Sequence, residues 1–183
     1  MIYPVLVYGN QMLRKRAEEI NKDYPNLSQI IEDMWETMYK AEGIGLAAPQ
    51  IGIPIRLFVI DGEEISDDHP ELKGFKKILI NAKLLEASGE PVTQVEGCLS
   101  LPTIKEEVVR PKRIRITYLD ENFKPHDEVY EDQRARVILH EYDHIEGKMF
   151  IDYLSPLRKR LLKGKLNSIT IGKVKIDYKI KIP

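Results

Sequence analysis

The clearest periodic pattern in the chain lies between Leu27 and Ala41, where apolar residues recur every three or four positions. This spacing places them on one face of an α-helix. The apolar positions are Leu27, Ile30, Ile31, Met34, Trp35, Met38 and Tyr39. Asn26 has the side chain of a helix N-cap, and Gly43 is a typical residue at a helix end. The pattern therefore predicts an amphipathic helix over 27–41.

Two further helices are indicated in the second half of the chain. The first covers Gln133–Glu146, with Asp132 as its N-cap and Gly147 as its end. The second covers Pro156–Ile171, because proline is well tolerated in the first turn and Gly172 follows the last apolar residue.

Strands are predicted where β-branched and aromatic residues form short runs or alternate with polar residues. These segments are 56–60, 77–81, 91–95, 104–109, 114–119 and 124–130. Residues 84–89 are predicted to lead into a turn, 43–52 to form a loop, and 11–19 to form a short helix. From Val174 to Ile182 apolar residues alternate strictly with polar ones, which predicts a half-buried terminal strand.

The composition is that of a folded domain. The 183 residues are 43% hydrophobic and 31% charged, and this length suits one domain over 1–183. The net charge is only -1, but the charge is unevenly distributed. Residues 156–183 contain nine Lys or Arg and one acidic residue, Asp177. A basic C-terminal helix and strand on an acidic body indicates either an anionic partner or a solvated face.

No apolar run is long enough to cross a bilayer, and the first residues lack the features of a signal peptide. Cys98 is the only cysteine, so no disulfide can form within the chain. Together these features favour a reducing, cytoplasmic location.

The strongest chemical signal is the segment from His140 to His144, an HExxH motif on the predicted helix 133–146. Residues four apart share a helix face, with Cβ atoms about 5–6 Å apart, so the two imidazoles can bind one metal ion. Glu141 lies one position round the helix, where it can act on a metal-bound water. The motif indicates a metallohydrolase whose third ligand remains to be found.

The third ligand is predicted to come from upstream of the motif. Many HExxH peptidases take a downstream Glu or His. Neither occurs after Glu146, and Asp152 lies just beyond the helix. The upstream candidates are Cys98, His69, His126 and several acidic residues. We favour Cys98, because a thiolate binds borderline metals strongly.

Three segments together resemble the signature motifs of the peptide deformylase family. They are Gly43–Gln50, Glu96–Ser100 and His140–His144, in the family's order, and the resemblance covers roughly Pro4 to Leu157. We expect a single α+β domain in which antiparallel and mixed β-sheets surround the central HExxH helix. A C-terminal helix and a terminal strand are expected to follow.

The resemblance implies a specific reaction: removal of the formyl group from the N-terminal formylmethionine of new polypeptides, with release of formate. Cys98, His140 and His144 match the family's metal ligands. The expected metal is Fe²⁺, with Zn²⁺, Ni²⁺ or Co²⁺ able to substitute. Glu141 matches the general base and acid.

Further positions match the family's oxyanion donors and suggest how substrate binds. The side-chain amide of Gln50 and the backbone N–H of Leu99 match the donors to the forming oxyanion. Gly45 is expected to let an extended peptide bind alongside as an added strand. Ile44 and Val137 are hypothesised to line the methionine pocket.

Two positions depart from the family pattern, and both concern methionine recognition. Arg136, four residues before His140, and Gln94, four before Cys98, stand where apolar residues are usual. The expected substrates are N-formylmethionyl nascent peptides, and the basic segment Arg158–Lys165 is expected to contact ribosomal RNA. The protein is expected to act as a monomer, without binding membranes or DNA.

Two alternative interpretations stay open at this point. A zinc peptidase would use Asp152 as its third ligand. A structural metal site in an RNA-binding protein would be closed by a fourth ligand such as His126. Asp143 is expected to orient a histidine, to pair with an arginine such as Arg110 or Arg113, or to be solvated.

Overall fold

The computed structural model describes all residues from Met1 to Pro183. Its α-helices are α1 (Leu27–Lys40), α2 (Asp132–Ile145) and α3 (Pro156–Thr170). Its strands are β1 (Val5–Leu6), β2 (Gly45–Ala47), β3 (Leu57–Asp61), β4 (Lys76–Gly97), β5 (Lys105–Leu119), β6 (Pro125–Glu131) and β7 (Ile180–Lys181). All neighbouring strands of the main sheet pair antiparallel, so the predicted α+β class is confirmed. No helix combines the length and hydrophobicity needed to span a membrane.

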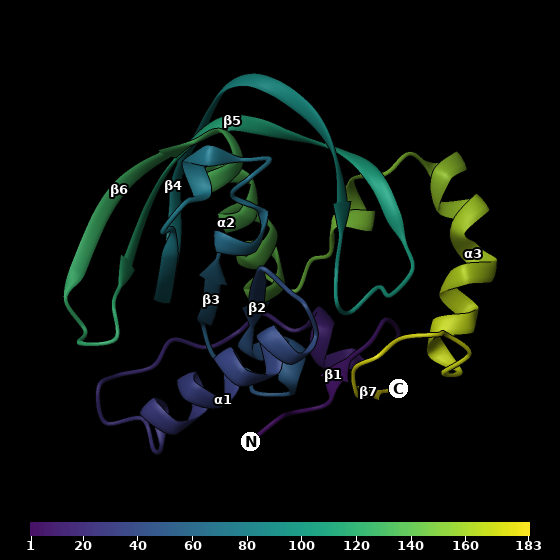
Figure 1. Ribbon diagram of the computed structural model, residues 1–183, viewed down its shortest axis with the longest axis horizontal. Coiled ribbons are helices and arrows are strands. Elements are labelled where there is room, and N and C mark those ends of the chain that lie inside the picture. The colour runs from purple at the N-terminus through teal and green to yellow at the C-terminus, as the bar shows by residue number, and fades with distance from the viewer.

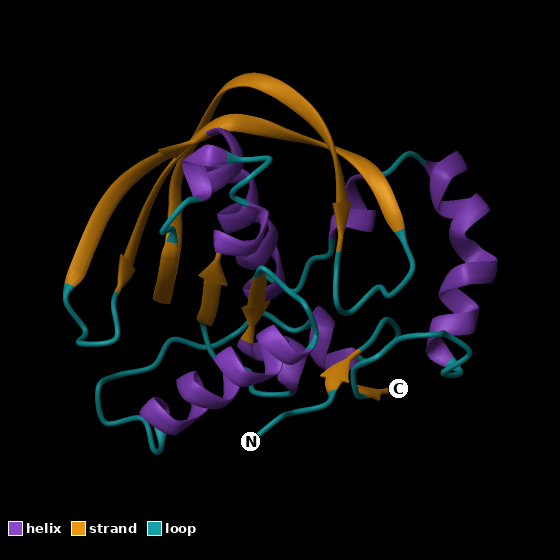
Figure 2. Ribbon diagram, in the orientation of Figure 1, coloured by secondary structure: helices purple, strands orange, loops and turns teal.

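The strands form two sheets around α2. Five antiparallel strands have the order β2-β3-β4-β5-β6, and β1 pairs with β7 in a short parallel ribbon. The long strands β4 and β5 arch over the top of α2, as Figures 1 and 2 show. Consequently the helix with the HExxH motif is enclosed on several sides, as expected from the sequence.

The arch forms because β4 and β5 are each a single bent strand. Their ladder shifts register at three places, the last between Ser88 and Pro91, and Pro91 lies opposite Pro111. Prolines cannot donate to a ladder and are found at bulges and edges. The predicted turn after 84–89 was therefore wrong: the chain bends there without leaving the sheet.

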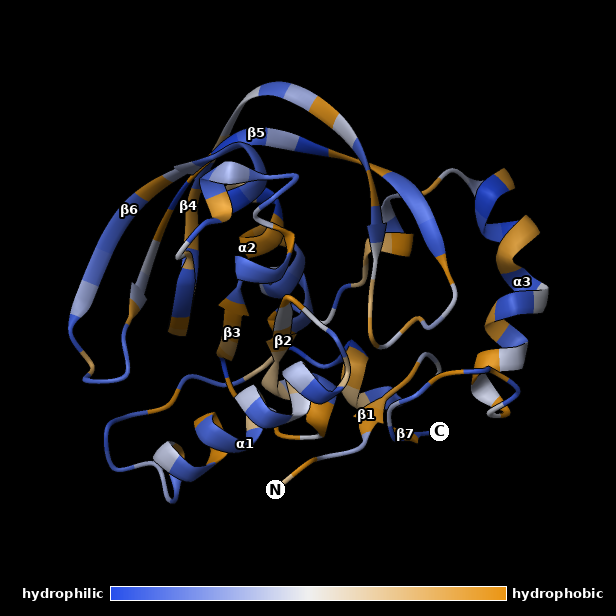
Figure 3. Cartoon of the chain, viewed as in Figure 1, coloured by the Kyte–Doolittle hydropathy of each residue, from blue (hydrophilic) through white to orange (hydrophobic).

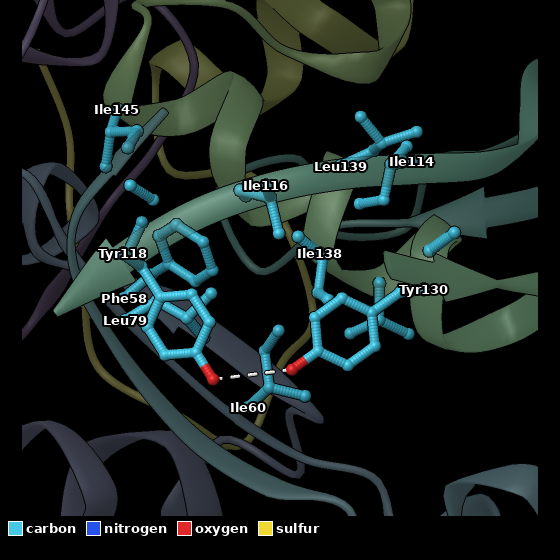
Figure 4. Packing of buried hydrophobic residues seen from close by; sticks show 14 of the residues in the cluster. Phe58, Ile60, Leu79, Ile114, Ile116, Tyr118, Tyr130, Ile138, Leu139 and Ile145 are labelled. Atoms are coloured by element: carbon cyan, nitrogen blue, oxygen red, sulfur yellow. Dashed lines mark hydrogen bonds between the residues drawn. The ribbon is translucent and has the colours of Figure 1, made fainter. Parts of the chain in front are cut away.

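The largest of three hydrophobic clusters lies between α2 and the sheet. β3 is hydrophobic along most of its length, as Figure 3 shows, and its residues from Leu57 to Ile60 are fully buried. Ile138 of α2 packs in the same cluster as Phe58 and Ile116. Figure 4 shows this packing, with the hydroxyls of Tyr118 and Tyr130 3.4 Å apart. This cluster holds α2 against the sheet.

The ends of the helices match the sequence predictions in part. Gly147 and Gly172 end α2 and α3 with φ angles of 74° and 72°. Gly43 closes α1 by donating its N–H to the Met38 carbonyl, although Glu42 has the left-handed backbone. The predicted N-cap role of Asn26 was wrong, because its backbone is left-handed and its side chain caps no N–H group.

Two other predictions were too long. The expected helix at 11–19 is only a 3₁₀ turn over Gln11–Arg14. The expected strand from Val174 to Ile182 pairs only at Ile180–Lys181. The side chains of 174, 176, 178 and 180 are nevertheless partly buried, while their neighbours are exposed. The alternation thus identified the inward-facing side chains but not a hydrogen-bonded strand.

Candidate metal centre

The site forms where the end of β4 meets one face of α2. His140 and His144 lie one helical turn apart, with ring centroids 5.3 Å from each other. Cys98 follows β4 directly, and its Sγ lies 3.3 Å from Nε2 of His144. One potential ligand atom from each of the three residues lies within 4.8 Å of the others. The structure thus brings the favoured upstream cysteine to the histidine pair.

The alternative ligands lie elsewhere. Asp152 is hydrogen-bonded to Arg14 at 2.7 Å and 3.1 Å. His126 stacks on Tyr118 and is hydrogen-bonded to Asp120. Neither residue belongs to the triad. The structure therefore supports neither a zinc peptidase with Asp152 as a ligand nor a structural metal site closed by His126.

The donor set fits a divalent transition metal. A thiolate and two imidazoles suit borderline ions such as Fe²⁺ and Zn²⁺. Burial lowers the pKa of the His144 imidazole, which favours the neutral ring that coordination requires. Beside the triad, Oε2 of Glu141 is buried without any hydrogen-bond partner. A buried carboxylate oxygen without a partner is expected where a ligand or water completes the site.

His140 is held in place by a carboxylate that sequence reasoning did not assign. Its Nδ1 lies 2.7 Å from Oε1 of Glu96, which leaves Nε2 for the metal. Burial raises the pKa of Glu96, but hydrogen bonds from His140 and Arg110 outweigh burial and lower it to about 2. Glu96 is therefore ionised and orients the ring, as outer partners of metal-bound histidines commonly do.

A buried polar network extends from Glu96 to Asp143 of α2. Arg110 donates to Glu96 at 2.7 Å and to Asp143 at 2.8 Å, so the expected pairing of Asp143 with Arg110 is confirmed. Tyr153 also donates to Asp143 at 2.8 Å. Arg113 pairs instead with Glu131. The network ties the two arched strands to the helix that carries the histidines.

Gln50 reaches the site from the turn after β2. It is buried, and its Oε1 accepts a hydrogen bond from the N–H of Ala47 at 2.8 Å. This fixes the amide so that Nε2 faces Ser100 Oγ at 3.1 Å and Cys98 Sγ at 3.7 Å. The neighbouring N–H of Leu99 makes no hydrogen bond within the protein. Two donors are thus available beside the cysteine.

Glu141 packs against backbone that has no side chain. A Cβ added to Gly45 would lie 2.7 Å from Cδ of Glu141, so only glycine fits there without a shift. Burial raises the pKa of Glu141 to about 7. A carboxyl with this pKa can both accept and return a proton near neutral pH.

The triad opens into a cleft of about 750 Å³. Gly45, Ile44 and Val137, for which the sequence suggested a role in substrate binding, all line this cleft. Arg136 also lines it, but its guanidinium is bound to Glu96 at 2.7 Å and to backbone carbonyls. Gln94 does not line the cleft, so of the two departures only Arg136 can affect the pocket.

The sequence of this chain matches that of a known protein family over most of its length. A family model described as polypeptide deformylase matches residues 2–160. The chain belongs to the polypeptide deformylase family. The Cys98, His140 and His144 triad is therefore the metal site of a deformylase.

Individual relatives agree over the full length. Peptide deformylases from Christiangramia forsetii and Flavobacterium psychrophilum are 47% and 50% identical, each covering 100% of this chain and 97% of the relative. The crystal structure of a peptide deformylase from Legionella pneumophila is 36% identical with a TM-score of 0.81, covering 94% of this chain and 98% of that one. The crystal structure of peptide deformylase from Thermus thermophilus is 38% identical with a TM-score of 0.81, covering 92% of this chain and 98% of that one.

For several residues of the cleft, no local sequence pattern indicated a position in the cleft wall. Ile65 and His69 come from the loop after β3, and Lys165, Ile176 and Tyr178 from the C-terminal region. Periodicity marked Ile176 and Tyr178 as inward-facing, but nothing local in the sequence placed them beside Cys98.

Proposed function

We propose that this chain hydrolyses the formyl amide of N-formylmethionyl nascent peptides, releasing formate and a free α-amine. The observation that carries the proposal is the convergence of Cys98, His140 and His144 beside the buried carboxylate of Glu141. The proposal places the reaction in the cytoplasm, where new polypeptides carry the formyl group. A monomer is sufficient, since one chain supplies every residue of the site.

The metal is proposed to be Fe²⁺, with Zn²⁺, Ni²⁺ or Co²⁺ able to replace it. Cys98, His140 and His144 hold it, and the mixed sulfur and nitrogen donors support any of these ions. When bound, such an ion supplies Lewis acidity and lowers the pKa of a coordinated water.

Glu141 is proposed to move the proton. It takes a proton from the attacking water, whose oxygen bonds to the formyl carbon. As the carbon–nitrogen bond breaks, it returns that proton to the departing amine. The raised pKa of about 7 supports this double role.

Gln50 and Leu99 are proposed to stabilise the negative charge on the formyl oxygen. The Gln50 amide is fixed by Ala47 and Ser100, and the free Leu99 N–H lies in the segment next to Cys98. Removing one such donor typically costs about 2.7–4 kcal/mol of transition-state stabilisation.

The substrate is proposed to bind as an added strand along β2. This strand is at the edge of the five-stranded sheet, and its first residue, Gly45, lines the cleft. Backbone pairing of this kind tolerates many sequences. Ile44 and Val137 then provide the apolar wall for the methionine side chain.

α3 is proposed to contact ribosomal RNA. It lies at the edge of the molecule (Figure 1), and Arg160 and Lys163 are exposed on it, whereas Arg158 is bound to Glu106. Phosphate contacts make affinity fall steeply with salt. Reversing the charges with Arg160→Glu and Lys163→Glu should weaken ribosome cosedimentation. Equal binding by that variant would refute the contact.

The catalytic proposal is tested by Glu141→Ala in metal-loaded protein. We expect metal content to be unchanged and formate release from a formyl-Met peptide to be abolished, since Glu141 is not a ligand. Retained turnover would exclude Glu141 as the proton carrier.

A further inference from the structure

The C-terminal segment forms part of the wall of the active-site cleft. After α3 ends, the chain runs back without regular structure from Lys173 to Lys179. Ile176 and Tyr178 of this segment line the same cleft as Cys98 and Glu141. A segment more than 70 residues downstream of Cys98 therefore faces the metal centre.

The segment is fixed in place immediately after Tyr178. The N–H of Val5 donates to the Lys179 carbonyl at 2.9 Å, and the N–H of Val7 donates to the Lys181 carbonyl at 3.2 Å. The last residue, Pro183, packs on Gly9, where an added Cβ would lie 2.7 Å from its Cγ. The tail is thus docked on β1 and holds Tyr178 at a defined position.

Tyr178 contacts the loop after β4 through its hydroxyl. The O–H donates to the backbone carbonyl of Leu99 at 2.8 Å, and the ring is partly buried. The Leu99 side chain packs on the other wall of the cleft, where a Cβ on Gly43 would lie 2.8 Å from its Cδ1. Leu99 is therefore held from two sides, by Gly43 and by Tyr178.

No other hydrogen bond of this loop reaches the Leu99 carbonyl. The N–H of Tyr8 donates to the Ser100 carbonyl at 2.9 Å, and Gln50 contacts the Ser100 side chain. The N–H of Leu101 bonds to the Cys98 carbonyl at 2.9 Å, which holds the peptide plane on the N-terminal side of Leu99, because that carbonyl and the Leu99 N–H share one plane. The plane on the C-terminal side of Leu99 is held by Tyr178. Only the Tyr178 hydroxyl bonds to the Leu99 backbone.

We propose that Tyr178 is a positioning residue, which keeps the Leu99 N–H aimed at the formyl oxygen by fixing the neighbouring Leu99 carbonyl. The inference rests on the proposed role of Leu99 as an oxyanion donor. Such donors contribute only when they are oriented before charge develops. Without the phenol O–H, rotation about the Leu99 backbone is less restricted, and part of that orientation is lost.

The test is Tyr178→Phe, which removes the hydroxyl and keeps the ring. Complete loss of an oxyanion donor lowers kcat about 10²–10³-fold, so loss of alignment is expected to lower it roughly ten-fold. KM for a formyl-Met tripeptide should stay within about two-fold, because the ring and the cleft wall remain. Metal content and melting temperature should match those of the wild type. The amide ¹⁵N resonance of Leu99 should shift.

Tyr24→Phe is the matched control, because the Tyr24 hydroxyl makes no hydrogen bond within the protein and lies outside the cleft. It should leave kcat and the Leu99 resonance unchanged. A Tyr178→Phe variant with wild-type kcat, or with raised KM alone, overturns the positioning role while the proposed function stands. Absence of deformylation by the wild type would instead overturn the proposed function, and this inference with it.

Discussion

Gly45 shows how one missing side chain can determine catalysis. Its backbone packs directly against the side chain of Glu141. A Cβ added to Gly45 would lie 2.7 Å from Cδ and 2.9 Å from Cγ of Glu141. Because Glu141 is buried on the rigid helix α2, it has little room to move away. From the sequence we expected a substrate peptide to lie beside this glycine, and only the structure showed that Glu141 packs against it.

Gly45→Ala should lower kcat/KM for a formyl-Met peptide by about 10²-fold, because small displacements of catalytic groups cost that much. The metal content should stay unchanged. Steady-state kinetics and metal analysis on the same preparation check this.

The matched control is Gly164→Ala, since a Cβ at Gly164 in α3 meets nothing within 4 Å. It should keep full activity and gain about 0.5–1 kcal/mol of stability. Equal activity of both variants would contradict the account of Gly45.

Glu96 sets the orientation of one metal ligand without touching the metal. Its carboxylate lies 2.7 Å from Nδ1 of His140 and is buried. Glu96→Gln should weaken metal affinity about 10–100-fold, the usual cost of losing an outer partner of a ligand. Competition with a chelator of known affinity measures this. Unchanged affinity would show that the His140 ring is positioned by packing alone.

Among the secondary-structure elements, the helices were predictable and the long strands only in part. α1 and α2 have strong apolar periodicity, and their glycine ends follow from local backbone geometry. β4 and β5 were read as shorter pieces, because Gly89 and Pro91 normally end a strand. Whether a proline interrupts or merely bends a strand depends on its partner, here Pro111, which lies far away in sequence.

The prediction of a terminal strand over Val174–Ile182 was wrong for a related physical reason. Alternation between Val174 and Ile182 reports which side chains face the protein. It cannot report whether backbone partners exist, and only Ile180 and Lys181 find them on β1. The unpaired part is the segment that forms the cleft wall and carries Tyr178.

The β5–β6 pair carries a carboxylate that makes stability depend on pH. Burial raises the pKa of Glu128, but hydrogen bonds from the hydroxyls of Tyr130 and Tyr118 outweigh burial and lower it below its ordinary value. A group with a lowered folded pKa contributes stability above its unfolded pKa, about 4.3, and loses it as the pH falls through the folded value.

Glu128→Gln should therefore be less stable than the wild type at pH 7, and the difference should shrink between about pH 5 and pH 3. Urea unfolding of both proteins across this range measures the difference, so that effects common to both cancel. A difference that stays constant down to pH 3 would show that the Glu128 carboxylate contributes nothing through its charge.

At the level of the whole molecule, the fold assembles one site from three distant segments. The turn after β2 supplies Gln50, the loop after β4 supplies Cys98 and Leu99, and α2 supplies both histidines. The triad was predictable because the histidine pair lacks a downstream ligand, and the three motifs together resembled a known family. The Glu96–Arg110–Asp143 network beneath it was only partly predictable, since it depends on how β4 and β5 lie over α2.

We propose that Cys98, His140 and His144 hold the metal with which this chain removes formyl groups. The most direct measurement is formate release from a formyl-Met peptide by anaerobically prepared protein, with metal analysis of the same sample. We expect about one ion per chain and rapid formate release in the wild type, and loss of both in Cys98→Ala. A Cys98→Ala protein that keeps its metal and its activity, or a metal-loaded wild type that releases no formate, would contradict it.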